Sequence, residues 1–67
     1  MNKKRIGERL RELRLKAGFT SMEVAKKCGV SDSTVRMWEL GQRTPSDPAK
    51  IKIANLYGET IEAIFFA

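Results

Sequence analysis

Residues 20–46 have the sequence TSMEVAKKCGVSDSTVRMWELGQRTPS, which predicts two short helices joined by a tight turn. Thr20 is placed to cap the first helix, and Glu23, three residues later, completes a capping box. Gly29 is placed to end that helix. The helix carries an apolar stripe at helical spacing, formed by Val24, Ala25 and Cys28.

The second of these helices is expected to start after Ser31, whose side chain can cap it, and to run to Leu40 before Gly41. Helical spacing turns Val35 and Trp38 inward. The polar residues of its first turn are therefore expected to point outward.

Three further helices are expected, over residues 4–17, 47–57 and 60–65. The first of them carries apolar residues at helical spacing, namely Ile6, Leu10, Leu13 and Ala17. Pro48 suits a first helical turn, and Thr60 suits a cap. No segment alternates apolar and polar residues for long enough to form a strand, so we expect an all-α fold of five short helices.

The chain has 67 residues, which predicts a single domain over residues 1–67. Apolar residues make up 42% of it, but no run is long enough to cross a membrane, and the basic N-terminus does not resemble a secretory signal. One cysteine and no histidine exclude an internal disulfide and a zinc site. We therefore expect a cytoplasmic, nucleoid-associated protein without cofactor, metal, membrane or small-molecule substrate.

The formal net charge is +5, and the charge is unevenly placed. Residues 3–16 hold seven Lys or Arg and two Glu, whereas the last ten residues hold two Glu and no basic residue. A basic surface attracts polyanions, so nucleic acid is the expected partner.

Three blocks in order, IGERLRELRLKAGFT (6–20), VAKKCGVSDSTVRMWELGQRTPS (24–46) and IKIANLYGETIEAIF (51–65), resemble the lambda-repressor-like helix-turn-helix family. This family includes phage Cro and repressor proteins and bacterial Xre-type regulators. The resemblance covers about residues 5–65. It implies a compact five-helix bundle, phage-encoded or bacterial, in which the second and third helices bind double-stranded DNA.

Carried over by position, the resemblance implies base contacts from Ser31, Asp32, Ser33, Arg36 and Met37. It implies phosphate contacts from Thr20, Ser21, Thr34, Gln42, Arg43 and Thr44. It also implies a structural ion pair between Arg14 and Glu39. The chain departs from the family at two positions, with Ser21 in place of the usual Gln and Leu40 in place of a common Asn.

Several of these side chains have more than one interpretation. Asp32 has two compatible interpretations: it accepts a hydrogen bond from cytosine N4, or it stabilises the first turn of its helix through the helix dipole. Arg36 contacts a guanine edge or a phosphate. Met37, expected to be exposed, packs on thymine methyl groups or is incidental surface.

Trp38 and Cys28 are expected in the core, since one aromatic ring alone forms no base-stacking platform and cysteine packs as a small apolar residue. The C-terminal Phe65 and Phe66 either form a weak homodimer contact or fold back into the core. A dimer in this family binds two half-sites about one helical turn, ~34–36 Å, apart, as in an inverted repeat.

These observations predict a sequence-specific transcriptional regulator, and in particular a repressor that occupies an operator. An enzyme is not expected, because no nucleophile and base pair or metal set is apparent. The alternative is the same fold used to bind protein, as in an antitoxin or antirepressor. The basic residues near the N-terminus and at Arg43 favour DNA.

Overall fold

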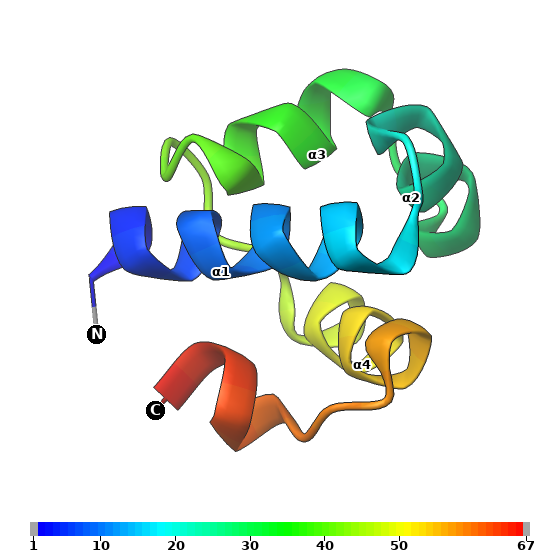
Figure 1. Cartoon of the computed structure of the whole chain (residues 1–67). Helices are drawn as coiled ribbons and strands as arrows, with labels where there is room; N and C mark the ends of the chain where they lie inside the picture. Colours follow the sequence, from blue (N-terminus) through cyan, green and yellow to red (C-terminus); the bar gives the residue numbers. More distant parts are fainter. Residues whose placement is uncertain (1, 67) are drawn as a thin grey trace.

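The computed structural model describes residues 2–66, which form five helices and no strand (Figure 1). The helices are α1 (Lys3–Ala17), α2 (Ser21–Cys28), α3 (Asp32–Glu39), α4 (Asp47–Tyr57) and η1 (Glu62–Phe66). The all-α, five-helix fold expected from the sequence is therefore confirmed. None of these helices combines the length and the apolar character that a bilayer span requires.

Local capping explains where α2 and α3 begin. The Glu23 amide donates to the Thr20 hydroxyl (3.1 Å), and the Thr20 amide donates to the Glu23 carboxylate (2.8 Å), so the predicted capping box is complete. The Ser31 hydroxyl accepts from the Thr34 amide at 3.1 Å. Between the helices, Gly29 has φ +70°, a left-handed conformation that a residue with a Cβ rarely adopts.

The core is formed by apolar side chains from all five helices: Ile6, Leu10, Val24, Ala25, Cys28, Val35, Trp38, Ala49, Ile53, Ala54, Ile64 and Phe65. Trp38 and Cys28 are both buried, as expected, so neither is available for base stacking or for surface chemistry. Of the apolar stripe expected on α1, Leu13 is only partly buried and Ala17 is exposed.

Helix α1 runs through the middle of the molecule (Figure 1). Helix α3 lies on one side of it, whereas α4 and η1 lie on the other. Helices α1 and α3 approach closely at Gly7, where an added Cβ would meet the Glu39 and Trp38 carbonyl oxygens at 2.4 and 2.6 Å. The absence of a side chain at Gly7 therefore sets the spacing between α1 and α3.

The C-terminal segment differs from the expected regular helix over residues 60–65. It forms a short helix of the wider π type, Glu62–Phe66, with the Thr60 hydroxyl accepting from the Ala63 amide at 3.0 Å. Phe65 is only 1% exposed within the chain itself, so it is not available as a surface contact for a second copy. Phe66 is 66% exposed.

Candidate nucleic-acid interface

The first turns of α2 and α3 meet through two side chains. The Ser21 hydroxyl donates a hydrogen bond to Oδ1 of Asp32. The other carboxylate oxygen, Oδ2, lies 3.0 Å from Nη2 of Arg36, one turn further along α3. Ser21, Asp32 and Arg36, three of the residues expected at DNA, are thus joined in one chain of polar contacts.

The outward face of α3 is polar at its start. Ser31, Ser33 and Arg36 are exposed, and Asp32 is partly covered. Met37 is also partly covered, which corrects the expectation of an exposed side chain. The amides of Gln42 and Arg43 donate to the Met37 carbonyl at 2.9 and 3.2 Å, and this brings the following loop against the last turn of α3.

The residues expected at phosphates lie on both flanks of α3. On one flank are Thr20 and Ser21, at the start of α2. On the other, Thr34 lines a shallow depression together with Arg43 and Thr44 of the loop after α3. Gln42, Arg43 and Thr44 are exposed, whereas Ser21 and Thr34 are partly covered. The hydroxyls of Thr34 and Ser31 lie 2.8 Å apart, so these two residues also contact each other.

The ion pair expected between Arg14 and Glu39 is present. Arg14 Nε and Nη2 donate to the two Glu39 carboxylate oxygens at 2.7 and 3.1 Å, and the side chains are only 14% and 10% exposed. This hydrogen bonding, with the negative charge of Glu39, raises the pKa of Arg14. The pair holds the last residue of α3 against α1 and so fixes the direction in which the outer face of α3 points.

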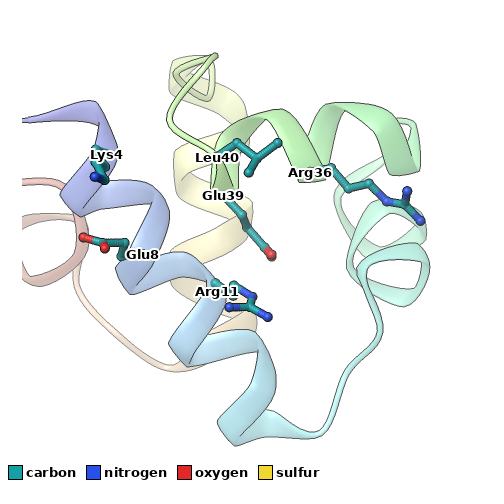
Figure 2. Close-up of a pocket in the computed structure, with 6 residues that line it drawn as sticks. All are labelled: Lys4, Glu8, Arg11, Arg36, Glu39 and Leu40. Atoms are coloured by element: carbon teal, nitrogen blue, oxygen red, sulfur yellow. The ribbon is translucent and has the colours of Figure 1, made fainter.

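A groove of about 480 Å³ is lined by residues at the end of α3 and in the N-terminal part of α1 (Figure 2). The residues that line it are Lys4, Glu8, Arg11, Arg36, Glu39 and Leu40. Lys4 and Arg11 were not among the predicted site residues. The only sequence signal for Lys4 and Arg11 was the cluster of basic residues at 3–16. That cluster does not indicate which of its members lie next to α3.

Two observations concern the cysteine and the possible metal ligands in the described part of the chain. Burial raises the pKa of the Cys28 thiol, with the positive charge of Lys52 opposing the shift, so the reactive thiolate is disfavoured. Between residues 2 and 66, no three His, Cys, Asp or Glu side chains lie close enough together to hold a metal ion. The candidate binding surface is the polar face of α3, where Ser31, Ser33 and Arg36 are exposed.

The sequence model of the helix-turn-helix family matches residues 10–64, and the chain belongs to this family. It is 36% identical over 52 residues to the HTH-type transcriptional regulator ImmR of Bacillus subtilis, covering 78% of this chain and 41% of ImmR. It is 42% identical over 57 residues to an uncharacterised HTH-type transcriptional regulator of Archaeoglobus fulgidus, covering 85% of this chain and 81% of that protein. The chain thus spans less than half of ImmR but most of the archaeal relative.

Two solved structures have the same fold. The restriction-modification controller protein C.AhdI from Aeromonas hydrophila superposes with a TM-score of 0.84 at 32% identity, covering 92% of this chain and 94% of that one. The clp gene regulator ClgR from C. glutamicum superposes with a TM-score of 0.82 at 22% identity, over 96% and 83% of the two chains. The identity to ClgR is low, and that likeness concerns the fold alone.

Proposed function

We propose that this protein regulates transcription by binding a specific sequence of double-stranded DNA, with α3 in the major groove. The observation that carries the proposal is the outer face of α3, where Ser31, Ser33 and Arg36 are exposed at the start and middle of the helix. The major groove is about 12 Å wide and admits one α-helix. The regulator names of the relatives support the same function.

Two segments beside α3 suit the phosphate backbone. The start of α2 combines hydroxyl groups with the free amides and positive dipole of a helix N-terminus. The loop of residues 42–44 is exposed and carries Arg43. Contacts of this kind position a protein on the duplex, whereas contacts to base edges decide the sequence. We assign Thr34 to the phosphate set as well, because it lies beside Arg43 and Thr44.

A second copy of the chain would complete the operator-binding unit. Phe66 is an exposed ring on η1. Helix η1 lies on the opposite side of α1 from α3 (Figure 1). A two-fold contact through Phe66 therefore leaves both α3 helices free for half-sites about 34–36 Å apart in an inverted repeat. Phe65, which is buried, has no part in this contact.

Repression is the simplest outcome of such binding, since a bound dimer occupies the DNA that another protein needs. The alternative use of the fold, binding to a protein partner, is favoured by one feature, the apolar side chain of Leu40, which is exposed at the end of α3.

The experiment that tests the proposal is a titration of a labelled duplex at several salt concentrations. If a dimer neutralises about six to eight phosphates, affinity falls by roughly 10³-fold or more between about 50 and 200 mM salt. The Arg43→Ala variant is expected to weaken binding to all sequences about equally and to lower the salt slope by about 1 per neutralised phosphate. A slope near zero for the wild-type protein contradicts DNA binding and favours the protein-partner alternative.

A further inference from the structure

Both oxygens of the Asp32 carboxylate are already engaged within the protein. Oδ1 accepts from the Ser21 hydroxyl, and Oδ2 faces the Arg36 guanidinium at 3.0 Å. The Asp32 side chain is 25% exposed. A carboxylate can accept about four hydrogen bonds, so a cytosine N4 donor would have to share an oxygen that already has a partner, on a side chain that is largely covered.

Arg36, unlike Asp32, is mostly exposed to solvent. Its side chain is 68% exposed, and Asp32 is its only ion-pair partner among residues 2–66. A guanidinium group has five N–H donors, more than one carboxylate oxygen can accept from, so further donors of Arg36 remain for an acceptor outside the protein. An exposed arginine loses side-chain entropy when it binds DNA. A partner that already restricts its conformations reduces the entropy lost on binding.

We propose that Ser21, Asp32 and Arg36 together select a base. Arg36 contacts guanine, and Asp32 positions Arg36. Guanine offers O6 and N7 in the major groove, which an arginine bonds with two N–H groups. Asp32 is then a positioning residue, and Ser21 in turn holds Asp32 from the neighbouring helix. This inference rests on the proposed function and names the base that α3 selects.

Charge also supports this arrangement. A free carboxylate at the start of α3 would repel the phosphates on either side of the groove. With Arg36 beside it, the pair is neutral overall, so the acid can remain at the interface. The short hydroxyl of Ser21 links α2 to α3 through Asp32.

The test is a binding survey on a duplex that the wild-type protein selects, with each base pair of one half-site replaced in turn. The variants are Arg36→Ala, Asp32→Asn, Ser21→Ala and the double variant Arg36→Ala/Asp32→Asn. Asp32→Asn keeps the shape of the side chain but removes its charge. The control is Asp47→Asn. Asp47 is the first residue of α4, as Asp32 is of α3, and its Oδ1 lies 3.7 Å from Nζ of Lys50. Thermal melting of each variant verifies that it is folded.

We expect Arg36→Ala to lose roughly 10-fold or more of the preference for guanine at one position, with the other positions unchanged. Asp32→Asn and Ser21→Ala should weaken the preference at that same position, and the double variant should behave like Arg36→Ala alone. Asp47→Asn should alter no position.

Three results would overturn the inference. If Asp32→Asn alters the preference at a different base pair, and the effects of the two substitutions add, Asp32 contacts a base itself. If Arg36→Ala weakens binding to all duplexes equally, Arg36 contacts phosphate. A wild-type protein that binds duplexes in a salt-dependent way, without preferring any base, would also remove this inference while leaving DNA binding itself intact. An absence of all binding would instead contradict the proposed function.

Discussion

Arg14 and Glu39 are joined by two hydrogen bonds, of 2.7 and 3.1 Å, between side chains 25 residues apart in the sequence. A third bond, of 3.0 Å, runs from Nη1 of Arg14 to the Phe19 carbonyl in the loop before α2. One guanidinium group therefore holds α1, the entry to α2 and the end of α3 together. The position of the outer face of α3 depends on this contact.

Glu39→Ala is expected to destabilise the protein by about 3 kcal/mol, because it leaves the guanidinium of Arg14 largely covered and without its partner. For a domain of this size, such a loss lowers the melting temperature by more than about 10 °C. Asp47→Ala, which breaks a pair with an exposed carboxylate, is the matched control and should cost less than about 1 kcal/mol. Equal melting temperatures for the two variants would remove the structural role of the Arg14–Glu39 pair.

Gly7→Ala is expected to destabilise the contact between α1 and α3. Its Cβ would lie 2.4 Å from the Glu39 carbonyl oxygen, a backbone atom that cannot rotate away. The cost should be about 1–3 kcal/mol or more, since overpacking forces the helices apart. Chemical denaturation measures it, with Glu8→Ala at the exposed neighbouring position as control. A Gly7→Ala protein as stable as the wild type would contradict the close approach of the two helices.

Tyr57 is the only tyrosine, so its ionisation can be followed by ultraviolet absorbance. Burial, with the nearby negative charge of Glu39, raises the pKa of Tyr57 to about 12. Because the unfolded chain releases this proton near pH ~10, the native state holds it more tightly, and the free energy of unfolding falls as pH rises from about 10 to about 12.

The Tyr57→Phe variant provides the control for this pH dependence. It should lose less stability over the same pH range than the wild type, and the wild-type absorbance midpoint should shift to about 10 in denaturant. A native midpoint already near 10 would show that the phenol is open to solvent.

Phe66→Ala is expected to weaken self-association and cooperative binding to a two-half-site duplex, with little effect on folding, because the ring is largely exposed. Analytical ultracentrifugation and duplex titration measure the two effects. Leu15→Ala, at an exposed apolar position on α1, is the matched control and should change neither. Self-association that is identical in the wild type and Phe66→Ala would exclude this ring from the contact.

The starts of α2 and α3 and the end of α2 were predictable because their signals are local. The Thr20–Glu23 capping box, the Ser31 cap and the left-handed Gly29 each involve residues a few positions apart. The Arg14–Glu39 contact came from the family resemblance, because no local rule pairs residues on different helices.

Other features depend on tertiary packing and were not apparent in the sequence. The Ser21–Asp32 hydrogen bond forms only when α2 and α3 meet at their first turns. Met37 is partly covered, and the amides of Gln42 and Arg43 in the loop after α3 donate to its carbonyl. Phe65 and Phe66 are adjacent and chemically identical, yet the path of the C-terminal helix buries one and exposes the other.

Selection from a randomised duplex library at physiological salt, followed by sequencing of the retained DNA, tests the central claim most directly. The account predicts enrichment of an inverted repeat with half-sites about 34–36 Å apart, each containing a guanine that Arg36→Ala no longer requires. A pool that remains random after repeated selection would contradict sequence-specific DNA binding by α3.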